Sequence, residues 1–193
     1  MVVTSISIWL AGVIGWFLIR LPYQRKSRKT KIEQTARTPL EMTSLVISGL
    51  SLGPLPALLI FTGWVSFADR PQYWVLVVIG ALLFAAALVL FKLTHKSLGK
   101  NWSVSLDLRE DHKLITDGVY AFARHPMYTA FWLWAIAQAF LLPNWIAGLL
   151  AIFGFGHLYF QRVFKEERMM EDQFGQEYRD YCQKTARLLP KIL

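Results

Sequence analysis

The hydrophobic positions of this chain fall into long runs separated by polar segments. The first run, 2–19, has only small hydroxyl residues among its apolar ones and is about as long as a membrane-spanning helix. The run 73–91 contains VLVVIGALLFAAALVL and predicts another spanning helix, in which Gly80 permits close helix contact. A further run, 42–67, is interrupted by Pro54 and Pro56, which are expected to kink or break its helix.

The last apolar stretch, 128–164, is divided by the residues PNW at 143–145. Proline and asparagine favour turns, so this stretch predicts a helical hairpin. Its first arm has only about 15 residues, which is short for a span. Together the runs predict an all-α integral membrane protein with about five transmembrane helices. We divide its single domain into a three-helix part, 1–91, and a core, 92–193.

Composition and charge support membrane residence. Hydrophobic residues make up 54% of the chain and charged residues 18%, which is too apolar for a water-soluble domain of this size. Segments 20–41, 92–127 and 162–193 hold every Lys and Arg except Arg70. The positive-inside rule therefore predicts that these segments are cytoplasmic and that the N-terminus lies outside. Because the net charge of +8 lies in blocks beside apolar runs, it favours juxtamembrane anchoring over nucleic-acid binding.

Several kinds of site are excluded by the residues present. The single cysteine, Cys182, rules out an intramolecular disulfide and a cysteine-cluster metal site. The four histidines lack metal-ligand spacing, so no metal is expected. No Walker loop, GxGxxG, GxSxG or HExxH motif occurs, so a nucleotide-like cofactor would need a fold other than the Rossmann type.

The segment GVYAFARHPMY, at 118–128, places polar groups at the start of a predicted helix. Pro126 disfavours helical backbone at His125 and suits the first helical position. The helix would then begin at the membrane surface with free N–H groups, which favour an anion such as a ligand carboxylate. Tyr128 lies three residues after His125, on the same helical face. The alternative is an interfacial cluster that faces lipid headgroups.

A second group of polar residues follows the last apolar run, in LYFQRVFKEERMME. Tyr159, Arg162, Val163 and Glu166 share one helical face. Arg162 and Glu166 are four residues apart and would form an ordinary surface pair. Alternatively, Glu166 holds Arg162 so that its guanidinium presents a fixed fork to a substrate anion.

Taken jointly, these motifs resemble the isoprenylcysteine carboxyl methyltransferase family, which is related to phospholipid N-methyltransferases. The resemblance covers about 101–190 and includes HKLITDGVYAFARHPMY, RVFKEE and FGQEYRDYCQKTARLLP. It implies that S-adenosylmethionine binds between the polar segment, the helix start and the C-terminal helix, leaving S-adenosylhomocysteine as product. The implied cofactor-binding residues are His112, Lys113, Leu114, Ile115, Tyr120, His125, Pro126, Met127 and Tyr128. Ser105 stands where some members have a glutamine near the cofactor.

The resemblance also implies catalytic roles for Arg162 and Glu166 on the substrate side. The expected acceptor is the C-terminal carboxylate of a prenylated cysteine or a similar lipophilic carboxylate, bound among membrane lipids. Two alternatives stay open, a phosphatidylethanolamine-type N-methyltransferase and a non-enzymatic membrane lipid-binding protein. Arg162 suits an anionic acceptor better than a cationic headgroup, and no predicted span carries the mid-bilayer charge typical of ion-coupled transporters. The sequence leaves the physiological acceptor and the oligomeric state open.

Overall fold

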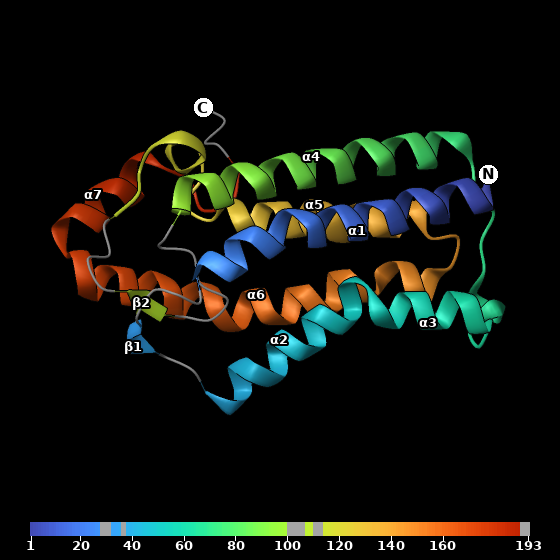
Figure 1. Ribbon diagram of the computed structural model, residues 1–193, viewed down its shortest axis with the longest axis horizontal. Helices are drawn as coiled ribbons and strands as arrows, with labels where there is room; N and C mark the ends of the chain where they lie inside the picture. The colour runs from blue at the N-terminus through green and yellow to red at the C-terminus, as the bar shows by residue number, and fades with distance from the viewer. Residues whose placement is uncertain (28–31, 36–37, 100–106, 110–113, 190–193) are drawn as a thin grey trace.

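The computed structural model describes residues 1–27, 32–35, 38–99, 107–109 and 114–189. Its long helices run side by side as a bundle (Figure 1). The α-helices are α1 (Val2–Ser27), α2 (Pro39–Leu52), α3 (Pro54–Thr62), α4 (Trp74–Leu98), α5 (Pro126–Leu141), α6 (Trp145–Phe174) and α7 (Gln176–Lys184). The shorter elements are the strands β1 (Ile32–Thr35) and β2 (Asp107–Arg109) and the 3₁₀ helices η1 (Ser66–Ala68) and η3 (Gly118–Ala121).

Within the described residues, three helices are long and apolar enough to cross a membrane: α1 over Val2–Arg25, α4, and α6. The pair α2 and α3, bent by 42°, makes a fourth if it forms one span. Helix α5 has 16 residues, which rise about 24 Å and fall short of the ~30 Å hydrocarbon core. A membrane protein with apolar helices is therefore confirmed. The count of five spans stays a prediction that depends on α5.

The predicted interruption of the second apolar run lies at Gly53 and Pro54. Gly53 separates α2 from α3, and Pro54 is the first residue of α3. Proline starts a helix at little cost, because an N–H at that position would have no intrahelical partner. Pro56 lies in the same first turn and is buried, so it causes no second break for the same reason.

Glycines allow the predicted close approach of α4 to its neighbours. A Cβ on Gly80 would lie 2.7 Å from Cγ of Leu141 in α5. A Cβ on Gly12 of α1 would lie 2.4 Å from the ring of Phe84 in α4. No real Cβ tolerates such distances, so both contacts depend on the absence of a side chain. Phe84 and Leu141 are almost completely buried in the core that α1, α4 and α5 share.

The predicted hairpin of α5 and α6 is also observed. Asn144 is the N-cap of α6, and its side-chain oxygen accepts a hydrogen bond from the Ala147 N–H at 3.0 Å. Helix α6 continues for 30 residues, well past Phe164 where the apolar run ends. It ends at Gly175, whose φ of 55° is a left-handed conformation that favours glycine.

The C-terminal end of α5 is capped by side chains from the turn before α4. Arg70 Nη2 donates hydrogen bonds to the carbonyls of Ala139, Phe140 and Leu142, at 2.6, 3.1 and 3.2 Å. Gln72 Nε2 donates to the Phe140 carbonyl at 3.0 Å. Unpaired carbonyls are costly in apolar surroundings, so these donors allow α5 to end early. The sequence had identified Arg70 only as the basic residue outside the three cytoplasmic segments.

The described parts of the three basic segments lie at one end of the bundle. Figure 1 shows α7, β1 and β2 at that end, whereas the N-terminus and α3 lie toward the other. Strands β1 and β2 pair antiparallel and join the first basic segment to the second. The sequence did not predict this pair, because strands of four and three residues carry too little pattern. The shared end agrees with the charge pattern, and its cytoplasmic orientation stays a prediction.

Cysteine labelling tests the topology. We expect Phe67→Cys, at a side chain that is 82% exposed, and Glu177→Cys, at an exposed position of α7, to react from opposite sides of the membrane. Both variants are made in a Cys182→Ser background and labelled with an impermeant maleimide in right-side-out and inverted vesicles. Labelling of both positions from one side contradicts the proposed arrangement.

Candidate active site

The start of α5 adopts the conformation predicted for the Arg-His-Pro sequence. Pro126 is the first helical residue, and His125 is the N-cap, with φ −124° and ψ 60°. His125 and Tyr128 are both buried, and their rings stack with centroids 5.3 Å apart. The predicted pairing of these two residues on one face of the helix is therefore confirmed.

The C-terminal segment 185–188 lies beside this helix start. The backbone N–H groups of Arg124 and His125 donate to the carbonyls of Ala186 and Arg187, at 2.9 and 3.0 Å. Thr129 Oγ1 donates to the Leu188 carbonyl at 2.6 Å. These bonds occupy the N–H groups of the two residues just before the helix, which hold the C-terminal segment. The expected anion site at the free N–H groups of the helix itself stays a prediction.

The carboxylate of Glu167 in α6 is the shared partner of the basic side chains in this region. Arg124 Nη2 lies 2.9 Å from its Oε1, and Arg187 Nη2 lies 2.6 Å from its Oε2. His125 Nε2 lies 3.3 Å from Oε1. Two guanidinium groups favour the ionised carboxylate, and the hydrogen bond to Glu167 raises the pKa of Arg187. The carboxylate thus ties α6 to the start of α5 and to the C-terminal segment.

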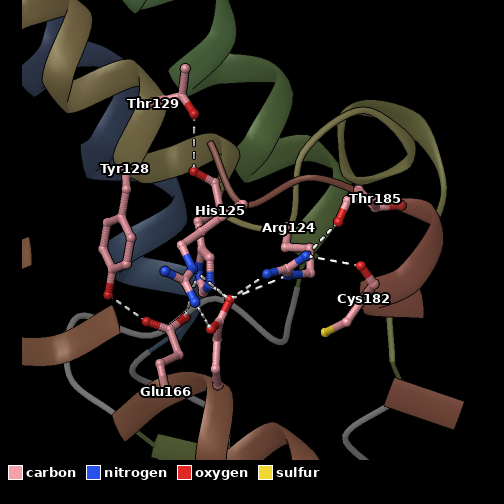
Figure 2. Close-up of polar contacts among 9 residues, drawn as sticks. Arg124, His125, Tyr128, Thr129, Glu166, Cys182 and Thr185 are labelled. Carbon is pink, nitrogen blue, oxygen red and sulfur yellow. Dashed lines mark hydrogen bonds and ion pairs between the residues drawn. The ribbon is translucent and has the colours of Figure 1, made fainter. Parts of the chain in front are cut away.

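Arg124 makes additional contacts with the C-terminal segment. Its Nη1 donates to the carbonyls of Thr185 and of Cys182, the latter at 3.2 Å. Figure 2 shows Arg124 directed toward these carbonyls, with His125, Tyr128 and Glu166 grouped beside it. A single guanidinium therefore joins a carboxylate of α6 to backbone carbonyls of α7 and of the C-terminal segment. The fork geometry of arginine permits this, whereas a lysine ammonium would not reproduce it.

Glu166 and Arg162 have different partners from those predicted. The Tyr128 hydroxyl donates to Glu166 Oε2, and His125 Nδ1 lies 3.9 Å from Glu166 Oε1. Arg162 instead forms an ion pair with Glu41 of α2, with 3.8 Å between Nε and Oε1. The expectation that Glu166 holds Arg162 is therefore corrected, because a carboxylate from another helix is packed against the arginine.

The other residues expected at the cofactor site are distributed around η3. Leu114 and Ile115 are half-buried before η3, and Met127 is half-buried in the first turn of α5. The carbonyl of Tyr120 accepts a hydrogen bond of 2.6 Å from the Tyr181 hydroxyl. Burial raises the pKa of Tyr181 to about 12, so this donor stays protonated at neutral pH.

The structure describes only part of the predicted cofactor site. His112, Lys113 and Ser105 lie outside the described residues. Within the described part of the chain, no hydrogen bond or ion pair joins Leu114 or Ile115 to His125, Tyr128 or Glu166. The contacts among the described residues are centred on α5 and α6, and the cofactor roles of Leu114 and Ile115 stay predictions.

Sequence reasoning left the role of Glu167 open and missed Arg187 and Glu41. Glu167 stands next to Glu166 in the quoted KEE motif, and Arg187 stands in the ARLLP tail. Glu167 could have been suspected, because a buried Arg124 needs an anionic partner. Nothing in the sequence around Glu41 distinguishes it, since its partner is more than a hundred residues away.

Comparison with known proteins places this arrangement in a family. A model of the isoprenylcysteine carboxyl methyltransferase (ICMT) family matches residues 76–172. This segment contains all of α5 and nearly all of α4 and α6. It therefore includes Arg124, His125, Tyr128 and Arg162, but not Glu41 or Arg187.

Individual relatives extend the similarity. A probable protein-S-isoprenylcysteine O-methyltransferase of Oryza sativa subsp. indica is 30% identical over 128 residues, 65% of this chain and 67% of the relative. The protein-S-isoprenylcysteine O-methyltransferase of Schizosaccharomyces pombe is 37% identical over 83 residues, 43% of this chain and 35% of the relative. That of Xenopus laevis is 27% identical over 187 residues, 92% of this chain and 64% of the relative. By its matched segment and these relatives, the chain belongs to the isoprenylcysteine carboxyl methyltransferase family.

Proposed function

We propose that this protein transfers a methyl group from S-adenosylmethionine to the C-terminal carboxylate of a prenylated cysteine or a similar lipophilic carboxylate. The observation that carries the proposal is the grouping of His125, Tyr128 and Glu166 in a family whose named relatives act on isoprenylcysteine. Arg162 lies on α6 one helical turn before Glu166. We place the active-site end of the bundle on the cytoplasmic side.

The residues at the start of α5 fit a cofactor that carries a sulfonium and an ammonium. The stacked rings of His125 and Tyr128 offer aromatic faces, which attract cations. Glu166 adds a carboxylate whose side chain is 34% exposed, so a ligand can reach it. When bound, S-adenosylmethionine supplies an activated methyl group with its own leaving group. Together with Leu114, Ile115, Tyr120, Pro126 and Met127, these residues would hold and orient it.

Arg162 suits the acceptor. A C-terminal carboxylate has a pKa of about 3.5, so it is ionised at neutral pH and needs no general base. The remaining requirement is to align a carboxylate oxygen with the methyl group in a site that excludes water. A guanidinium offers a planar fork that matches a carboxylate. Because the Arg162 side chain is only 10% exposed, its interaction with an anion would be weakly screened by water.

The nature of the acceptor is tested by offering two acceptors in parallel assays. Purified protein is incubated with methyl-labelled S-adenosylmethionine and either a farnesylcysteine analogue or phosphatidylethanolamine. We expect a base-labile methyl ester on the farnesylcysteine analogue and no labelled phospholipid, because Arg162 favours an anion over a cationic headgroup. Labelled phosphatidylethanolamine without the ester would assign the protein to N-methylation. Absence of any product with both would overturn the proposed reaction.

Variants of Arg162 separate acceptor binding from cofactor binding. We expect Arg162→Ala to lower kcat/KM for the farnesylcysteine analogue by about 10- to 100-fold, as for a lost charged hydrogen bond. Arg162→Lys should recover little, because an ammonium lacks the planar fork. Calorimetric affinity for S-adenosylhomocysteine should stay within about twofold of wild type in both. An Arg162→Lys enzyme within about threefold of wild-type turnover would show that the fork is not needed.

Glu167→Gln tests whether the C-terminal segment supports the cofactor site. The amide keeps the shape but removes the charge shared by Arg124 and Arg187, a loss of roughly 1–3 kcal/mol at a partly exposed site. We expect faster hydrogen exchange at the His125 amide and roughly tenfold weaker binding of S-adenosylhomocysteine. Glu171→Gln, which removes an exposed pair with Arg179, is the matched control and should change neither. Unchanged exchange and affinity in Glu167→Gln would refute this role.

A further inference from the structure

Glu41 is a buried carboxylate in the first turn of α2. The residue is 4% exposed, and its N–H donates to Oγ1 of the N-cap Thr38 at 3.1 Å. It lies outside the segment 76–172 that the family model matches. A carboxylate is rarely buried to this extent without a pairing or functional reason, because removing the charge from water is costly.

The partner of Glu41 is the arginine to which we assign acceptor binding. Glu41 Oε1 lies 3.8 Å from Nε of Arg162, and the side chains are 4% and 10% exposed. At this burial the attraction between the charges is stronger than at a protein surface. At 3.8 Å the contact is an ion pair longer than a hydrogen bond, so charge attraction keeps the guanidinium close to Glu41.

The register of α2 on α6 keeps Glu41 at this position. One turn beyond Glu41, Ser44 Oγ lies 3.1 Å from Nε2 of His157. Further along, a Cβ on Gly154 would lie 2.1 Å from Oγ of Ser51. Helices α2 and α6 lie side by side through these contacts (Figure 1). A shift of α2 by one turn along α6 would break the contacts of Glu41, Ser44 and Ser51, so packing fixes the position of Glu41.

From this geometry we infer that Glu41 is a positioning residue, which holds the Arg162 guanidinium in the orientation that binds the acceptor carboxylate. The inference rests on the proposed function of Arg162. It assigns to α2 a part in the reaction, although α2 lies outside the family match. Glu41 acts through Arg162 and need not touch the acceptor. The Glu41 carboxylate would also repel the acceptor carboxylate. The acceptor would therefore bind only where Arg162 compensates the negative charges.

The test compares Glu41→Gln with wild type, with Glu41→Asp and with the control Glu171→Gln. Glutamine keeps the size and polarity of the side chain but not its charge, whereas aspartate keeps the charge on a shorter arm. We expect Glu41→Gln to raise KM for the farnesylcysteine analogue and to lower kcat/KM about tenfold, because a misaligned fork binds the carboxylate less well. Glu41→Asp should recover part of the loss. Affinity for S-adenosylhomocysteine should change by less than about twofold in both variants.

A double variant separates positioning from a merely architectural role. If Glu41 acts through Arg162, adding Glu41→Gln to Arg162→Lys should lower kcat/KM by less than about twofold more. Additive losses, or a Glu41→Gln enzyme that loses S-adenosylhomocysteine binding, would mean that Glu41 only supports the helix packing and would overturn the inference. Wild-type kinetics in Glu41→Gln would overturn it as well. Failure of the proposed function would be distinguishable, because the wild-type protein itself would then not methylate the analogue.

Discussion

The carboxylate of Glu167 is the interaction on which the arrangement of the active-site end depends. It accepts charged hydrogen bonds from Arg124 and Arg187 and lies 3.3 Å from His125. Glu167 belongs to α6, Arg124 and His125 precede α5, and Arg187 belongs to the C-terminal segment. One side chain therefore connects three separate parts of the sequence. Removing Glu167 would leave the guanidinium of Arg124, whose side chain is 11% exposed, without its carboxylate partner.

At the opposite end of the bundle, side chains also satisfy buried polar groups, and there they donate to backbone carbonyls. There, Arg70 and Gln72 satisfy the carbonyls at the end of α5, and Asn144 caps α6 while its amide donates to the Val65 carbonyl at 2.7 Å. Helix α5 thus begins at Pro126 and ends at Leu141, where Arg70 and Gln72 satisfy its last carbonyls. Its start is held at the level of Glu167, where the apolar part of the bundle gives way to charged residues. A polar cofactor and a lipid-linked acceptor could meet at such a boundary.

The sequence predicted what depends on local pattern. The apolar runs, the break at Pro54, the hairpin at Asn144 and the helix start at Pro126 follow from hydropathy and backbone preference. It did not predict the partners of Arg162 and Arg124, because Glu41 and Glu167 are distant from them in sequence and ion pairs have no periodic signature. The capping by Arg70 was missed for the same reason. The pair β1–β2 was missed because strands of three or four residues carry too little pattern.

An experimental structure with S-adenosylhomocysteine and a farnesylcysteine analogue bound together would test the central claim most directly. We predict the cofactor against the rings of His125 and Tyr128, and the acceptor carboxylate about 3 Å from terminal nitrogens of Arg162. One carboxylate oxygen should face the cofactor sulfur, with room between them for a methyl group. A cofactor at the end of the bundle near Arg70, or a carboxylate remote from Arg162, would contradict the proposed site.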